Sequence, residues 1–401
     1  MKENVSFTNA REIMTEFAML TGLSPTGRVP PQRYLWTDAF AVCNFLGLYR
    51  RTKDEKVRDL ALGLVEQVHN ILGRHREDDP RTGWISGLHE REGKMHPTKG
   101  GLRIGKELNE RRPTDIFDER LEWDRDGQYY HYLTKWMHTL NCVSRVTGTP
   151  TYNRWAIELA KTAHARFTYL PSSSDEKRMH WKMSIDLSYP LVPSMGHHDP
   201  LDGFITYNQL KATAAIDPEN STRPELSPEI TDMAHICEGK SWATDDPLGI
   251  GGLLSDAYRA AQLIVNGNLE QTDLPEILLN AGMEGLGFYA ASSQWKLPAD
   301  DRLAFRELGL SIGLRAVGKL QELISRYPGI FNKMDSLHSK IESLMQYAPL
   351  IKIIEMFWLE PKNREAQSWM EHRNINMVML ATSLAPDGYL TLNYFKPGTP
   401  I

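Results

Sequence analysis

An apolar helix followed within a few residues by an amphipathic one is the feature that most constrains how this sequence folds. Residues Thr37 to Tyr49 are apolar on nearly every side, which is typical of a fully buried helix. Residues Val57 to Leu72 instead carry one apolar stripe with polar residues opposite, which is typical of a helix that covers a core. The pair predicts an inner and an outer helix joined by the short turn from Arg50 to Asp54.

The same pattern returns about one hundred residues later, which indicates an internal repeat. Aligning Thr52 with Thr147 places the apolar stripe after Thr52 on the stripe that runs from Tyr152 to Ala163. A chance resemblance between two amphipathic helices is the alternative. Further inner and outer helices are expected in pairs: Phe204–Ala215 with Ser227–Glu238, Leu253–Val265 with Leu274–Tyr289, Leu303–Val317 with a stretch from Gly318 to the region of Ile341, and Glu365–Leu380 with the N-terminal helix Thr8–Thr21.

Twelve helices in six hairpins would close a ring, so the sequence predicts one all-α domain over residues 1–401, an (α/α)6 toroid. The loops entering inner helices are long, namely Leu23–Trp36, His75–Asp126 and Leu170–Gly203, whereas the turns leaving them are short. All long loops would then lie on one face, where short strands such as Lys182–Leu187 or Gly388–Leu392 are also expected. A site is expected on that face.

Composition excludes several classes of partner. The chain has 401 residues, a net charge of −5 and no dense Lys/Arg run, which argues against a nucleic acid or an anionic membrane as partner. Cys43, Cys142 and Cys237 are widely separated and lack metal-ligand spacing, so reduced thiols are expected. The N-terminus lacks a signal-peptide pattern, and no apolar run approaches the roughly 20 residues that span a bilayer. We expect a cytoplasmic protein; the sequence leaves the oligomeric state open.

The stretch from Glu122 to Trp136 gathers groups suited to a binding site. Three carboxylates, Glu122, Asp124 and Asp126, precede a helix whose first turns carry aromatic, imidazole and ammonium groups: Tyr129, His131, Lys135 and Trp136. Asp126 is expected to cap this helix. Aromatic residues among acids favour a pocket wall over an ordinary solvated helix start, which is the alternative.

A second cluster, from Met195 to Gly203, places His197, His198, Asp199 and Asp202 just before an inner helix. A metal site is disfavoured because adjacent His side chains usually diverge and no His follows at i+4. We expect these residues to line the mouth of a cavity. The loop from His75 to Asp126 is expected to be a lid or binding loop, with a solvated insertion as the alternative; its Gly100-Gly101 pair lacks the spacing of a nucleotide-binding loop.

Trp36-Thr37-Asp38, at the start of the first inner helix, resembles the Trp-x-Asp of some unsaturated-sugar hydrolases. Together with the hairpin pattern it resembles the six-hairpin glycosidase-like superfamily. That superfamily includes glycoside hydrolases, unsaturated glucuronyl hydrolases and the N-acylglucosamine 2-epimerase group. The resemblance implies a small-molecule or oligosaccharide substrate.

Hydrolysis of a glycosidic bond needs one proton-bearing and one ionised carboxyl group. Glu122, beside Trp123, is the expected proton donor and Asp199 the ionised partner, with no cofactor and no metal. Two alternatives stay open: a sugar epimerase that uses His residues as acid and base, and a sugar-binding toroid without catalysis. The residues expected to bind substrate are Arg33, Trp36, Asp38, Asp124, Asp126, Tyr129, His131, Lys135, Trp136, His197, His198 and Asp202.

Overall fold

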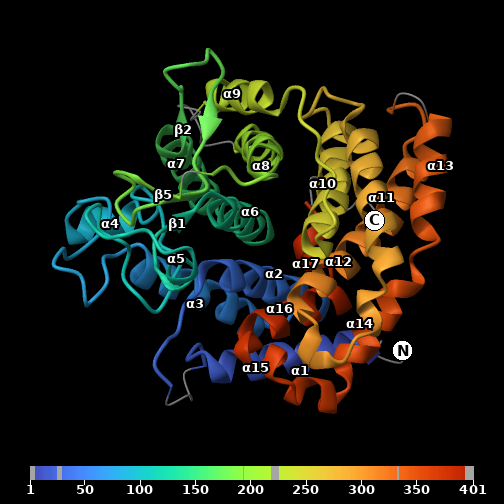
Figure 1. Ribbon diagram of the computed structural model, residues 1–401, viewed down its shortest axis with the longest axis horizontal. Helices are drawn as coiled ribbons and strands as arrows, with labels where there is room; N and C mark the ends of the chain where they lie inside the picture. The colour runs from blue at the N-terminus through green and yellow to red at the C-terminus, as the bar shows by residue number, and fades with distance from the viewer. Residues whose placement is uncertain (1–4, 25–28, 193, 218–224, 332–333, 393–401) are drawn as a thin grey trace. The chain divides into compact units, whose positions relative to one another are not determined.

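A computed structural model describes residues 5–24, 29–192, 194–217, 225–331 and 334–392 (Figure 1). The chain divides into two compact units. The N-terminal unit comprises residues 18–239, and the C-terminal unit comprises residues 1–17 and 240–401. That the whole chain forms one domain stays a prediction.

The N-terminal unit contains three hairpins of one inner and one outer helix. Its inner helices are α2 (Leu35–Thr52), α6 (Tyr130–Thr147) and α8 (Asp199–Ala214), and α6 packs against both of the others. Their partners are α3 (Glu55–Leu72), α7 (Pro150–Phe167) and α9 (Ser227–Cys237). Nearly every residue of α8 is buried, whereas α9 buries only Met233 and Ile236. This contrast is the one that the apolar and amphipathic patterns predict.

The turns that leave α2 and α6 have the same geometry. Thr52 ends α2 and Thr147 ends α6, and each is followed by a residue in the left-handed region, Lys53 (φ 58°) and Gly148 (φ 71°). The outer helix begins two residues after that position in both cases. The proposed alignment of Thr52 with Thr147 is therefore confirmed at the backbone.

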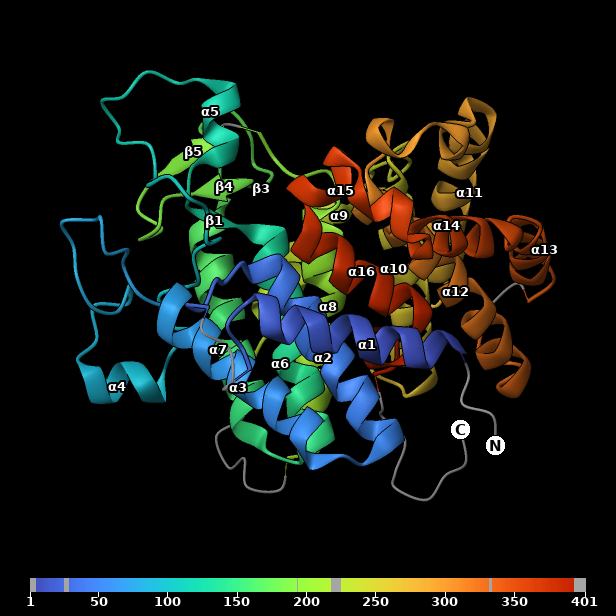
Figure 2. The same cartoon turned by 90° about the horizontal axis from the view of Figure 1, so that it is seen from below.

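In the C-terminal unit, α12 (Ala304–Arg326) packs against α10 (Pro247–Val265) and α16 (Arg373–Leu384). Gly251 of α10 faces Gly309 of α12, and a Cβ on Gly251 would collide with the Gly309 backbone, so the two helices need glycine to approach this closely. The outer helices are α11 (Leu274–Ser292), α13 (Met334–Met345), α14 (Pro349–Leu359) and α1 (Val5–Leu20). Figure 2 shows α1 beside α16, and Glu16 of α1 forms an ion pair of 2.6 Å with Arg373 of α16.

Three expected boundaries in the C-terminal unit are wrong. The segment Glu365–Leu380 is not one helix: a 3-10 turn (Pro361–Glu365) and the short α15 (Gln367–Glu371) precede α16. Gly318 does not end its helix: α12 continues to Arg326, and a Cβ added at Gly318 would meet open space. Gly388 lies in α17 (Asp387–Leu390) instead of a strand. Further 3-10 turns span Gln294–Lys296 and Ala299–Asp301.

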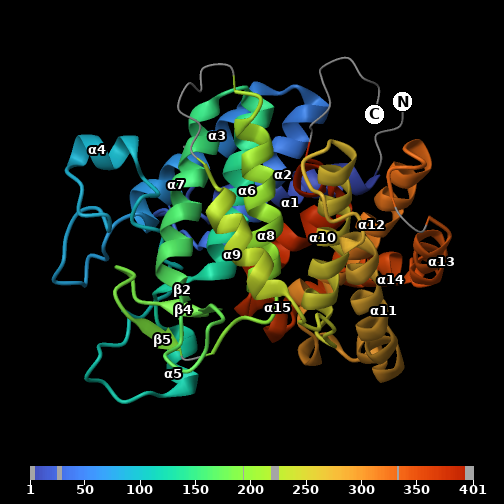
Figure 3. The same ribbon diagram turned by 90° about the horizontal axis from the view of Figure 1, so that it is seen from above.

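The loops that precede α6 and α8 share a small sheet that leads into the N-terminal end of α6 (Figure 3). They contain α4 (Glu90–Met95), α5 (Glu119–Asp124) and a three-stranded antiparallel sheet in the order β1 (Gln128–Tyr129), β4 (Lys182–Met183), β5 (Pro190–Val192). A second pair joins β2 (Thr168–Tyr169) to β3 (Arg178–Met179). Because β1 leads directly into α6, the sheet positions the first turn of that helix.

Among the described residues, no helix has the length and apolar character needed to cross a membrane.

Candidate functional site

The first turns of α6 and α8 bring acidic and basic groups together. His131 Nδ1 lies 3.7 Å from Asp199 Oδ1, and Lys135 Nζ lies 2.7 Å from Asp202 Oδ2. The Thr134 hydroxyl donates a hydrogen bond to the same oxygen of Asp202. Residues three or four positions apart share one helix face, so α6 presents its base and cation to the two acids of α8.

Asp199 is the least solvated acid of this group. It is 4% exposed, and its buried Oδ2 has no hydrogen-bond partner among the described residues. Gly196 packs against the carboxyl so closely that a Cβ there would overlap it. Burial, and then the nearby charge of Asp202, raise the pKa of Asp199 to about 8. Asp199 is therefore a protonated carboxyl at neutral pH.

His131 complements this acid because its imidazole is neutral. Burial, and then the positive charge of Lys135, lower the pKa of His131 below its usual range, although 30% of the side chain is exposed to solvent. A neutral imidazole has one nitrogen lone pair that accepts a proton. The site thus pairs a proton donor with a proton acceptor, while Asp202 and Lys135 form an ion pair beside them.

Aromatic rings lead from this acid to the surface. The His131 ring lies nearly parallel to Trp181, at 6.3 Å and 16°, and Tyr129 contacts both rings at centroid distances of 5.3 and 5.2 Å. Trp181 in turn meets Trp123 edge-on at 5.3 Å. Trp123 is 50% exposed, so the row of rings begins in solvent and ends beside Asp199.

Tyr132 connects this group to α2. Its ring meets His131 edge-on at 4.8 Å, and its hydroxyl lies 2.7 Å from that of Tyr34. Trp36, at the start of α2, lies 6.5 Å from the Tyr132 ring. The first turns of all three inner helices of the N-terminal unit therefore contribute to one region.

Neither a comparison with known protein families nor one with curated protein sequences finds a match. Solved structures do match. The GH76A α-1,6-mannanase of Salegentibacter sp. matches over 95% of this chain and 99% of its own, with 11% identity and a TM-score of 0.50. The fold is the six-hairpin (α/α)6 toroid. Cellobiose 2-epimerase of Spirochaeta thermophila matches over 93% of this chain and 97% of its own, with 10% identity and a TM-score of 0.47. The match to the mannanase confirms the predicted fold class.

Within this toroid, Arg33 and Asp38 form a buried pair at the start of α2. Arg33 Nη1 lies 3.5 Å from Asp38 Oδ1, and the backbone N–H of Tyr34 donates to Asp38 Oδ2 at 2.9 Å. Burial raises the pKa of Asp38 to about 6, against the opposing effect of Arg33. Both residues are engaged with each other and with the backbone, so they support the entry to α2.

Glu122 lies in a different environment from the one expected of a proton donor. It is buried, its Oε1 accepts from Lys182 Nζ at 2.8 Å, and its Oε2 accepts from Arg111 Nε at 3.3 Å. Lys182 also donates to the carbonyls of Glu122 and Arg125. Two cations on one buried carboxylate suit a structural ion pair better than a proton donor.

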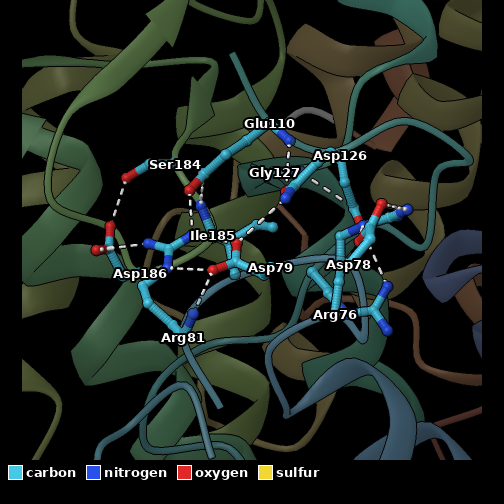
Figure 4. Close-up of polar contacts among 12 residues, drawn as sticks. Arg76, Asp78, Asp79, Arg81, Glu110, Asp126, Gly127, Ser184, Ile185 and Asp186 are labelled. Carbon is cyan, nitrogen blue, oxygen red and sulfur yellow. Dashed lines mark hydrogen bonds and ion pairs between the residues drawn. The ribbon is translucent and has the colours of Figure 1, made fainter. Parts of the chain in front are cut away.

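Asp126 does not cap α6, because the residue at that position is Tyr129. Asp126 is instead fully buried, where its Oδ1 accepts from the backbone of Gly105 and its Oδ2 from Arg103 at 2.9 Å. Figure 4 shows Asp126 beside Arg76, which lies 3.4 Å from Oδ2. Its role is therefore to hold the loop that enters α6.

A second ion cluster in Figure 4 joins two of the long loops. Arg81 contacts Asp79 at 2.7 Å and Glu110 at 2.5 Å within the first loop, and Asp186 at 2.9 Å in the loop that follows α7. The backbone N–H of Ile185 also donates to Glu110. These contacts cross-link the loop from His75 to Asp126 to the loop that follows α7, and the two joined loops are called the cap below.

The other expected residues divide by exposure. Trp136 is fully buried and donates to His69 Nε2 at 3.1 Å, so it packs in the helix core where a ligand does not reach it. Asp124 is exposed on α5, and no ion pair among the described residues includes it. His197 and His198 do not diverge as adjacent histidines usually do; their rings lie 4.6 Å apart just before α8.

The structure adds residues that the sequence analysis missed. Lys182 begins β4, and Trp181 directly precedes it. Tyr34 follows Arg33 in the sequence, and Tyr132 follows His131. Alternation in the Lys182–Leu187 segment was a signal for a strand, but nothing in it indicated pairing with β1. Among the described residues, the only three metal-ligating side chains that converge are Cys43, His138 and Cys142, which lie deeper between the helices.

Proposed function

We propose that the protein is a carbohydrate-active enzyme, a glycoside hydrolase in which Asp199 is the proton donor. The observation that carries this proposal is the buried Asp199 carboxyl, protonated at neutral pH, with one oxygen that no described residue engages. Protonation of the departing glycosidic oxygen requires a carboxyl of this kind. A similar fold in an α-1,6-mannanase supports the choice of substrate class.

Asp202 is the ionised partner in this proposal. It lies one helical turn after Asp199, and it forms an ion pair with Lys135. Residues at i and i+3 share one helix face, so both carboxyl groups lie on the same side of α8. The row of rings from Trp123 to His131 supplies flat faces on which sugar rings stack. Glu122, the proton donor expected from the sequence, instead supports this row of rings through its ion pair with Lys182.

Epimerisation of a reducing sugar is the second candidate, because one specific contact favours it. The neutral imidazole of His131 lies 3.7 Å from Asp199. A neutral base beside a protonated acid is the arrangement needed to remove a proton next to a carbonyl and return it. In this reaction His131 is the base and Asp199 the acid that protonates the carbonyl oxygen.

The test compares both reactions on defined substrates with wild type, Asp199→Asn and His131→Asn. Hydrolysis is followed as reducing ends released from α-1,6-mannan, and epimerisation as deuterium taken up from D2O by cellobiose. A hydrolase loses on the order of 10² to 10⁴ in kcat with Asp199→Asn and keeps turnover with His131→Asn. If cellobiose takes up deuterium with wild type but not with His131→Asn, the proposed function becomes epimerisation instead of hydrolysis. Sugar binding without either reaction overturns both.

A further inference from the structure

Three metal-ligating side chains converge inside the N-terminal unit, away from the proposed acid. Cys43 lies in the middle of α2, and His138 and Cys142 lie four residues apart on α6. All three are buried, at 0%, 1% and 3% exposure. Their Sγ and ring nitrogen atoms all lie within 4.8 Å of one another. The cysteines show no metal-ligand spacing among themselves; the sequence signal for this cluster is the His-x-x-x-Cys spacing of His138 and Cys142.

We propose that Cys43, His138 and Cys142 bind a zinc ion that joins α2 to α6. In a tetrahedral zinc site, bond lengths of about 2.3 Å to sulfur and about 2.0 Å to nitrogen separate neighbouring ligand atoms by roughly 3.4 to 3.8 Å. Cys142 Sγ and His138 Nε2 already lie 3.5 Å apart. The set as a whole needs Cys43 to move inward by about 1 Å, a small change for one side chain.

The hydrogen bonds around His138 select the tautomer that a metal requires. Asn141 Nδ2 donates to Asn153, which leaves Asn141 Oδ1 to accept from Gln209 Nε2 at 2.8 Å. Gln209 Oε1 is then the acceptor in its contact with His138 Nδ1 at 3.1 Å. The proton of His138 is therefore on Nδ1, and the lone pair of Nε2 points toward Cys142. A ligand histidine held through its other nitrogen is the usual arrangement in protein metal sites.

Charge also favours a divalent ion here. Two thiolates and one neutral imidazole sum to −2, so a zinc ion makes the buried group neutral, and a water molecule would take the fourth position of the tetrahedron. In the metal-free protein the Cys43 thiol donates to Thr139 Oγ1 at 3.6 Å, because the Thr139 proton already goes to the carbonyl of Ala39. Metal binding would displace the two thiol protons.

The zinc site and the proposed acid site are separate. His138 and Cys142 lie seven and eleven residues after His131, which corresponds to about 10 and about 16 Å along α6. The ion would therefore fix the two inner helices beneath the catalytic groups without taking part in the reaction. The proposal does not depend on the substrate or on the reaction.

The experiment measures metal content and cobalt binding by the full-length chain. Protein purified without chelators is expected to contain about one zinc per chain, and the apo form titrated with Co²⁺ is expected to show a thiolate-to-cobalt charge-transfer band. Cys142→Ser should abolish both signals. Gln209→Leu should weaken cobalt binding by roughly 10- to 100-fold, because it frees the ring of His138. The matched control is Cys237→Ser, which alters the third cysteine, outside the cluster.

Two results overturn the proposal. One is a folded wild-type protein that contains no zinc and gives no charge-transfer band with Co²⁺. The other is loss of metal from Cys237→Ser as well as from Cys142→Ser, which would place binding elsewhere. If Cys142→Ser does not fold, the melting temperatures of wild type and Cys237→Ser are measured with and without a chelator. A lower melting temperature with chelator in both proteins supports the site, and an unchanged melting temperature rejects it.

Discussion

Replacing Asp199 by Asn is expected to stabilise the protein at neutral pH while it removes activity. The reason is the raised pKa of about 8 for this carboxyl in the folded protein, against 3.8 for an unperturbed one. Between these values the unfolded chain has lost a proton that the folded chain keeps. Stability therefore falls as the pH rises through this window, by about 1.4 kcal/mol per pH unit.

The size of the effect follows from the window. At pH 7, about three pH units above the unfolded pKa, ionisation of the unfolded chain disfavours folding by up to about 4 kcal/mol, and at pH 5 by only about 1.6 kcal/mol. Asn keeps the shape of the protonated carboxyl and does not titrate. The free energy of unfolding of Asp199→Asn, relative to that of wild type, should therefore increase as the pH rises from 5 to 7.5.

Guanidinium unfolding of wild type and Asp199→Asn at several pH values from 4.5 to 8 measures this gain. Asp59→Asn, on the exposed face of α3, is the matched control and should follow wild type at every pH. A constant difference between Asp199→Asn and wild type across the range would refute the reasoning, because it would show that Asp199 titrates alike in both states. So would a variant that becomes less stable relative to wild type as the pH rises.

Three further predictions concern the surroundings of this acid. Lys182→Met should destabilise the protein by about 3 kcal/mol, since it removes one of the two cations on the buried Glu122 and the donor to two carbonyls, and adding Glu122→Gln should restore part of the loss in a double-mutant cycle of unfolding free energies. Gly196→Ala should lower kcat with little change in melting temperature, because the new Cβ displaces the Asp199 carboxyl; unchanged kcat would show that this carboxyl is not the donor. Trp123→Ala should leave stability within about 0.5 kcal/mol and raise KM for long oligosaccharides more than for disaccharides; an equal effect on both would remove Trp123 from the binding surface.

The helices were predictable because a helix with one buried face has apolar residues at a regular spacing of three or four positions. The apolar helix around Phe45 and the stripe through Leu64 follow from residues only three or four positions apart, and so does the equivalence of Thr52 with Thr147. Helix ends were less accurate where the pattern continues past them. Gly318 looked like a stop, yet a helical glycine that faces open space costs too little to end α12.

The roles of the acids were harder to predict because ionisation depends on partners distant in sequence. Glu122 sits beside Trp123, but sixty residues separate it from Lys182, which determines its surroundings. Asp199 was expected to be the ionised acid, and its burial under Gly196 makes it the protonated one. The neighbouring charge of Asp202 was visible three residues later; the depth of the pocket was not.

The contacts between the two long loops have a consequence for motion. The pair of Glu122 with Lys182, the bridge from Arg81 to Asp186 and the pairing of β1 with β4 all join the loop that enters α6 to the loop that enters α8. Neither loop can swing away alone without exposing a charge that its partner neutralises. Opening of this cap is thus expected to be one cooperative event, in which the amides of both loops exchange with solvent at a common rate. Access to Asp199 would then be controlled by a single conformational equilibrium, shared by segments that lie far apart along the chain.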